Sequence, residues 1–195
     1  MARKWNRVVS ATRTVHIYLT VFAMLLMVFF AATGLLLNHE EWVTAGEAAP
    51  VETTGTLPMA LLTHEPDTAG IVASLRTTYG ALGALSTFDS DGEELRVELR
   101  GPGRRFEAAI TLATGAMKIT TENRPFLIRM DDLHRGKDSG TAWSWLIDLS
   151  AILLLLGALT GITLWIALPK RRTLGLIALG LGVGVCVVVY LLIVP

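Results

Sequence analysis

The sequence contains a single cysteine, Cys186, which lies inside a long apolar run near the end of the chain. Disulfide bonds within the chain are therefore excluded, whichever compartment the protein faces. A GxSxG nucleophile motif, a glycine-rich phosphate loop and paired cysteines are also absent from the sequence. These absences argue against a hydrolase or a nucleotide-binding enzyme, and no nucleic-acid partner is expected.

Acidic residues are missing from two short basic segments of the chain. The basic residues of the first segment, which precedes the first apolar run, are Arg3, Lys4, Arg7 and Arg13. The second segment, Pro169–Thr173, separates the last two apolar runs, and every acidic residue except Asp148 lies in the middle of the chain. A soluble helical bundle has no reason to sort its charges in this way, whereas short basic loops mark the cytoplasmic side of a membrane protein.

Three apolar runs are long enough to cross a bilayer, which takes about 20 residues. Hydrophobic residues make up 52% of the chain and its mean hydropathy is +0.51, so a membrane protein is expected. The predicted segments are a basic N-terminus (1–14), a first transmembrane helix (15–38), an outer α+β domain (39–141), a second helix (142–168), a basic turn (169–173) and a third helix (174–195). The first run is longer than the 7–15 residues that are usual in a signal peptide, so we predict an uncleaved anchor.

The charge pattern also predicts an orientation. Because basic loops stay inside, the N-terminus and the Pro169–Thr173 turn are expected in the cytoplasm. The 39–141 domain and the extreme C-terminus are then expected outside. The fold class that follows is α-helical and membrane-spanning, with three transmembrane helices and a small α+β domain inserted between helices 1 and 2.

The outer domain begins with a polar stretch that resembles a linker, and Leu57 and Pro58 then favour a short helix. A longer helix is predicted where apolar residues recur every fourth position from Ile71 to Tyr79. Asp67 or Thr68 can cap this helix and Gly80 can end it. The stretches "ALSTFDS", "LRVELRG", "RRFEAAITL" and "ATGAMKIT" then predict an antiparallel meander, and "RPFLIRMDDLHRG" predicts a helix that returns to the membrane.

Polar residues of the outer domain give no clear site. His64, in "LTHEP", is expected to be a plain surface residue, and the Arg100, Arg104 and Arg105 cluster favours a solvated hairpin face over an anion site.

Three of the four histidines lie at the ends of the apolar runs. His16 and His39 bracket the first run and, on a straight helix, lie roughly 35 Å apart. The second helix runs antiparallel to the first, which places His134 at the same level as His39. Two imidazoles at one membrane depth are the ligand pair that a six-coordinate haem b needs.

Other interpretations of these polar residues stay open. Imidazoles are common at membrane interfaces without any ligand, and a transition-metal site could instead use carboxylates from Glu40, Glu41, Asp131 and Asp132. His16 has no histidine or methionine partner in the facing stretch 165–173. Three interpretations of His16 stay open: it pairs with His16 of a second copy of the chain, it binds iron alone, or it is structural. Asp148, near Trp143 and Trp145, is expected to make a polar contact with a neighbouring helix or the outer domain, with proton transfer or substrate contact as the alternative.

Two long motifs resemble one family. "RTVHIYL…FAATGLLLNHE" (Arg13–Glu40) and "DLHRG…WSWLIDLS…LTGITLW…KRR" (Asp132–Arg172) look like PepSY-associated transmembrane proteins. The third run carries no such signature. The resemblance implies a bacterial inner-membrane protein with a periplasmic PepSY domain. Some relatives hold haem b and reduce ferric siderophores, which implies His16 and His134 as ligands.

The resemblance supports two functions from different classes. The first is haem-b electron transfer, in which His39 and His134 are the axial ligands, and Arg129 and Arg135 pair with the propionates. Electrons would pass from quinol or a membrane donor to a periplasmic ferric chelate or other metal, as in a haem-dependent metalloreductase. The second is a non-enzymatic binding or regulatory module, or an accessory subunit of a larger complex. Glycine motifs in the apolar runs would suit a homo-oligomer in either case.

Overall fold

The computed structural model describes residues 2–39, 41–42, 48–62 and 66–194. The chain divides into two compact units. The first unit combines residues 1–27 with 149–195, and the second spans residues 28–148. Glu40 and His64 are not among these residues, so the predictions made for them lie outside the described part of the chain.

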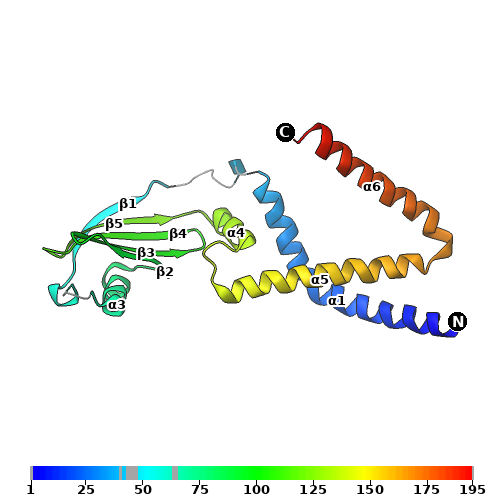
Figure 1. Ribbon diagram of the computed structural model, residues 1–195, viewed down its shortest axis with the longest axis horizontal. Helices are drawn as coiled ribbons and strands as arrows, with labels where there is room; N and C mark the ends of the chain where they lie inside the picture. The colour runs from blue at the N-terminus through cyan, green and yellow to red at the C-terminus, as the bar shows by residue number, and fades with distance from the viewer. Residues whose placement is uncertain (1, 40, 43–47, 63–65, 195) are drawn as a thin grey trace. The chain divides into compact units, whose positions relative to one another are not determined.

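The second unit contains a five-stranded antiparallel sheet (Figure 1). The strands are β1 (Val51–Thr56), β2 (Ala84–Ser90), β3 (Glu94–Gly101), β4 (Arg104–Thr111) and β5 (Ala116–Asn123). Their order in the sheet is β1-β5-β4-β3-β2, so β2 to β5 form the predicted meander and β1 adds an edge strand next to β5. The helices that lie wholly within the described part of this unit are the short 3₁₀ helix η1 (Met59–Leu61), α3 (Thr68–Tyr79) and α4 (Phe126–Arg135).

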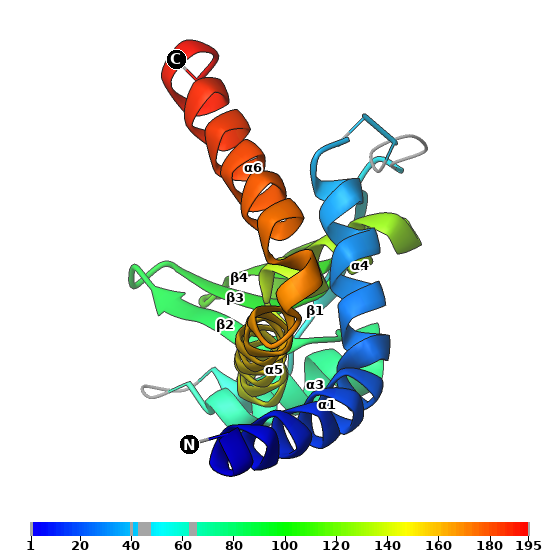
Figure 2. The same cartoon turned by 90° about the vertical axis from the view of Figure 1, so that its right-hand side faces the viewer.

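Helix α3 covers one face of the sheet, as Figures 1 and 2 both show. Asp67 caps its first turn by accepting a hydrogen bond from the Gly70 backbone N–H at 3.0 Å, and Gly80 ends it at φ +67°. The fully buried Ile71 and Leu75 pack into the core. The core residues of the sheet are Leu95, Val97, Leu99, Phe106, Ala108, Ile110, Met117 and Ile119. The predicted helix, its caps and its apolar face are confirmed.

Strand β1 corrects the sequence-based prediction of a linker before Leu57. Its side chains are almost all exposed, so the alternation that marks a half-buried strand is absent from its sequence. The strand forms because β5 offers it a pairing edge and Tyr79 fixes its end. The Tyr79 hydroxyl accepts from the Thr56 N–H and donates to the Thr56 carbonyl, both at 3.0 Å. A side chain at Gly55 would clash with the Tyr79 ring.

The other face of the sheet carries a charge network centred on Glu98, whose side chain is nearly buried. Arg100 donates to its carboxylate at 2.9 Å and Arg105 donates to it as well. Burial raises the pKa of Glu98. The hydrogen bonds from these two arginines lower the pKa by more than burial raises it, so the pKa of Glu98 lies below its ordinary value. The network therefore favours the folded state when Glu98 is ionised.

Glu98→Gln should make the unfolding of the sheet domain less dependent on acid pH. Because the folded-state pKa of Glu98 is lowered, its stabilisation is present above the unfolded-state pKa and is lost as the pH falls through the folded-state value. We expect a loss of about 1–2 kcal/mol near pH 7 that disappears as the pH falls through the lowered folded-state pKa of Glu98. Thermal unfolding of the full chain in detergent between pH 3 and 7 measures this difference.

Glu52→Gln is the matched control for the pH experiment. Glu52 also forms an ion pair, with Lys118 at 2.9 Å, but both side chains are about 60% exposed. Exposed pairs contribute little to stability, so this variant should follow the wild type. An equal acid response in Glu52→Gln and Glu98→Gln would contradict the role assigned to Glu98.

Three long apolar helices are confirmed: α1 (Ala2–Leu37), α5 (Thr141–Ile166) and α6 (Arg172–Leu192). By length and composition each can cross a membrane. In chain order the sheet lies between α1 and α5, and the 3₁₀ helix η2 (Pro169–Arg171) precedes α6. Helix α1 extends further than predicted, because the basic segment expected at 1–14 is also helical from Ala2. No glycine or proline interrupts that segment, and charged residues do not stop a helix.

Candidate functional site

His134 lies against the last turns of α1, within the second unit. Its Nδ1 atom is 2.6 Å from the Thr33 hydroxyl oxygen, and Thr33 is almost fully buried. The ring also lies beside Gly34, where an added Cβ would be 3.4 Å from its Cε1 and 4.0 Å from its Nε2. The Phe30 ring meets the imidazole edge-on at 5.3 Å. A threonine, a glycine and an aromatic ring therefore fix this histidine at the end of an apolar helix.

Backbone contacts hold the segment that carries His134. The Trp143 indole N–H donates to the Leu133 carbonyl at 2.7 Å, and its ring packs edge-on against Phe29 at 5.9 Å. On the opposite side of α4, the buried Asp132 carboxylate accepts from the Gly103 N–H at 2.8 Å. Helix α4 is thus tied both to the sheet and to the start of α5, so the position of His134 follows from the packing of both.

His16 makes the equivalent contacts within the first unit. Its Nδ1 atom lies 2.8 Å from the Thr160 hydroxyl oxygen, and an added Cβ at Gly161 would be 3.5 Å from its Cε1. The facing residue is therefore Thr160 rather than a residue of the 165–173 stretch that the sequence suggested. One turn earlier, Gly157 packs against Leu19. The glycines of this G-x-x-x-G motif thus serve the packing of α5 on α1 within one chain.

His39 lies two residues beyond the end of α1. Its Nδ1–H donates to the Leu35 carbonyl at 3.0 Å, and its ring stacks on Trp42 at 4.0 Å. Helical periodicity points Leu35 about 200° away from Thr33, where His134 is bound. Within the described residues no contact joins the two imidazoles, so their pairing on one iron stays a prediction that requires His39 to move.

The two arginines expected near a porphyrin edge have defined positions. Arg135 pairs with Asp131 at 2.7 Å, one turn before it on α4. Arg129 donates through Nε to the Arg124 carbonyl at 3.3 Å and packs its side chain against Gly103 in the β3–β4 turn. Arg135 therefore lies next to the His134 site in sequence, whereas Arg129 supports the hairpin.

Other acidic candidates do not assemble into a metal site in the described residues. No group of three or more His, Cys, Asp or Glu lies close enough there to hold a metal ion. Asp131 and Asp132 are occupied by Arg135 and Gly103, and Glu41 is exposed. Asp148 is exposed on α5, and within the described residues no side chain bonds to it, so its polar contact with a neighbouring helix or the outer domain stays a prediction.

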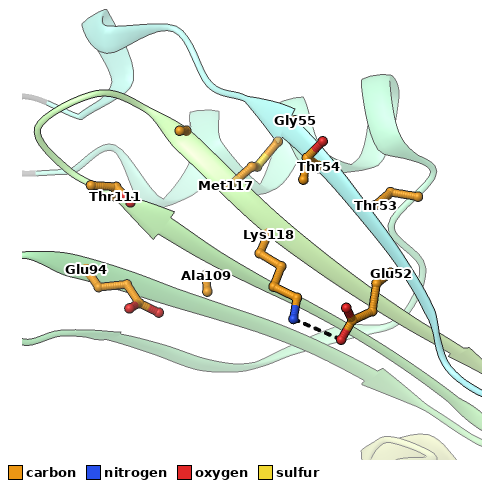
Figure 3. A pocket seen from close by; sticks show the side chains of 10 residues that line it. Glu52, Thr53, Thr54, Gly55, Glu94, Ala109, Thr111, Met117 and Lys118 are labelled. Carbon is orange, nitrogen blue, oxygen red and sulfur yellow. Dashed lines mark ion pairs between the residues drawn. The ribbon is translucent and has the colours of Figure 1, made fainter.

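The sheet has a shallow pocket on its charged face, seen in Figure 3. It has a volume of about 820 Å³, and small side chains such as Ala109 and Thr111 form its floor. The Lys118–Glu52 ion pair borders it. Its lining residues include no histidine, cysteine or serine, so it offers a binding surface rather than a nucleophile with a base.

One comparison with known proteins is informative. A family model described as PepSY_TM-like matches residues 10–195, which is nearly the whole chain. The chain belongs to the PepSY_TM-like family. This PepSY_TM-like protein is accordingly a membrane protein with a PepSY domain, and the resemblance seen in its first two apolar runs is confirmed. The match also includes α6, whose apolar run carries no signature of the family that could be recognised in the sequence. No curated protein and no solved structure matches it.

Two residues of the PepSY_TM-like protein were missed by sequence reasoning, Thr33 and Thr160. A signal for them exists, because each stands before a glycine in the similar strings "TGLLL" and "TGITL" of the first two apolar runs. A threonine inside a helix is usually satisfied by its own backbone, which hides such a role in a hydropathy pattern.

Proposed function

We propose that this protein is a haem-b electron-transfer protein of the bacterial inner membrane that passes electrons to a periplasmic acceptor. The observation that carries the proposal is the setting of His134, which is fixed through Nδ1 at the end of an apolar helix. In the described part of the chain its Nε2 atom has no hydrogen-bond partner, and His16 shares this arrangement.

The residues fit the chemistry of a haem ligand. Histidines that bind metals usually engage their second ring nitrogen in a hydrogen bond, which fixes the ring and leaves the other nitrogen for the metal. His134 and His16 both meet this condition. Haem b, when bound, would supply one-electron chemistry, and its potential would depend on the axial ligands and the polarity around them.

The chain's own residues would bind and orient the group. His134 would supply a nitrogen ligand to the iron, Phe30 would keep water from that side of the imidazole, and Arg135 would offer N–H donors to a propionate. His39 is the second ligand that the sequence predicts, and it would have to leave the Leu35 carbonyl to take that role. Quinol or a membrane partner is the proposed donor, and a ferric chelate or another metal is the proposed acceptor.

The proposed orientation rests on charge. The basic residues near the N-terminus and those of η2 would lie in the cytoplasm, which would place the sheet domain and the C-terminus in the periplasm.

A visible spectrum of the purified protein tests the proposed function. Protein from haem-replete cells, purified in mild detergent, should show a Soret band when oxidised and sharp α and β bands after dithionite reduction. A pyridine haemochrome assay then gives the haem content per chain. A colourless preparation from such cells would reject the proposal.

A second candidate function is a non-enzymatic binding or regulatory module, and one observation favours it. The sheet domain presents the pocket of Figure 3 beside the edge strand β1, a geometry that can take an extended segment of a partner protein. A colourless protein that co-purifies in a stable complex with another membrane protein would favour this candidate.

A further inference from the structure

The same three-residue contact occurs twice in the chain, once in each unit. In the second unit His134 meets Thr33 and Gly34 of α1, and in the first unit His16 meets Thr160 and Gly161 of α5. In both, Nδ1 faces the threonine hydroxyl and Cε1 lies over the following glycine.

The threonine hydroxyls determine which nitrogen of each imidazole carries the proton. The Thr33 hydroxyl lies 2.7 Å from the Phe29 carbonyl oxygen, one turn back on its own helix. The Thr160 hydroxyl lies 2.7 Å from the Leu156 carbonyl oxygen in the same way. A carbonyl oxygen only accepts, so the single hydroxyl proton of each threonine is donated to it. The hydroxyl oxygen must then accept from the histidine, which requires a proton on Nδ1.

The opposite tautomer would lose a hydrogen bond at each place. An unprotonated Nδ1 would face a hydroxyl lone pair, or would draw the hydroxyl proton away from the carbonyl. Leaving a polar group unsatisfied in apolar surroundings is costly, and few other partners exist on these helices. Both contacts are therefore fully satisfied in one protonation pattern only, in which Nε2 keeps its lone pair.

We infer that Thr33 and Thr160 are equivalent positioning residues, which hold His134 and His16 in the Nδ1–H tautomer so that each Nε2 can bind a metal centre. The inference rests on the proposed function for the identity of that centre, a haem iron. It extends the proposal by assigning two equivalent ligand positions to the chain, one in each unit. The glycines let each imidazole lie close to the helix that carries its threonine.

Nitrogen-15 NMR of the full chain, labelled at histidine and held in detergent without haem, tests the tautomers directly. His134 and His16 should both give the Nδ1–H pattern. Thr33→Val should change the pattern of His134 alone and Thr160→Val that of His16 alone, while Thr33→Ser and Thr160→Ser should restore it. Thr163→Val is the matched control, because Thr163 donates to the Leu159 carbonyl and does not contact a histidine. A wild-type Nε2–H pattern at either histidine, or a pattern unchanged by the valine variants, would overturn the inference.

Haem titration of the same variants separates the inference from the proposed function. Loss of a hydrogen-bond partner of a metal ligand typically weakens binding by about 10–100-fold, and we expect that effect for each valine variant at its own histidine. Wild-type haem binding with no weakening in the valine variants would reject the positioning role and leave the proposed function standing. The Nδ1–H pattern in a protein that takes up no haem would reject the proposed function and support the positioning role.

Discussion

His134→Ala should remove the haem bound in the second unit and thereby lower the haem content per chain of the purified protein. The imidazole is the proposed ligand there, and its contacts with Thr33, Phe30 and Gly34 fix its position. Alanine supplies no nitrogen, and the methyl group leaves a space beside Phe30. The measurement is the pyridine haemochrome content per chain, together with the height of the reduced α band.

His39→Ala is the matched histidine variant for this experiment. Because His39 bonds to Leu35 and stacks on Trp42, away from Thr33, we expect it to keep the haem content and the band shape of the wild type. A change from low-spin to high-spin bands in His39→Ala would instead establish the His39–His134 pair that the sequence predicts. Retention of the full haem content in both His39→Ala and His134→Ala would refute the ligand assignment in the second unit.

Leu75→Ala should lower the free energy of unfolding of the sheet domain by about 2–5 kcal/mol. Leu75 is fully buried between α3 and the sheet, and truncation would leave a cavity next to Ile71. The free energy of unfolding of a small domain is only about 5–15 kcal/mol, so a loss of this magnitude is readily measured. Thermal unfolding of the full chain in detergent, followed by a signal from the sheet, measures it.

Thr78→Ala on the same helix is the control for Leu75→Ala. Thr78 is exposed, and alanine favours a helix slightly more than threonine does, so the free energy of unfolding should stay within a few tenths of a kcal/mol. Equal losses in the two variants would show that α3 does not pack on the sheet through Leu75.

The parts of the fold that could be predicted are those in which neighbouring residues decide the outcome. Helix α3 has a capping aspartate, a regular apolar face and a terminal glycine, and all three lie within one short segment. Strands β3 and β4 each place a buried apolar residue at every second position, because one face meets the core. Strand β1 could not be recognised, because its partners are β5 and Tyr79, far away in the sequence.

The candidate site could be predicted only in part for a similar reason. The level of His134 follows from topology, since a helix that enters from outside begins where the first one ends. The side of α1 that it meets depends on the route of α4, which Asp132 and Trp143 fix by contacts outside that helix. The sequence therefore indicates a histidine at one end of α1 without indicating whether Thr33 or His39 faces it.

The positions of the two histidines in the chain determine the order in which their contacts with Thr33 and Thr160 form during synthesis. His134 is separated from Thr33 by 101 positions, whereas His16 is separated from Thr160 by 144. The contact of His134 can close when only the start of α5 has left the ribosome, but His16 must wait until α5 is nearly complete. Because α5 is synthesised after α4, the His16 contact is the later of the two to form. Cofactor insertion at His16 would accordingly depend on a bilayer that already holds both helices.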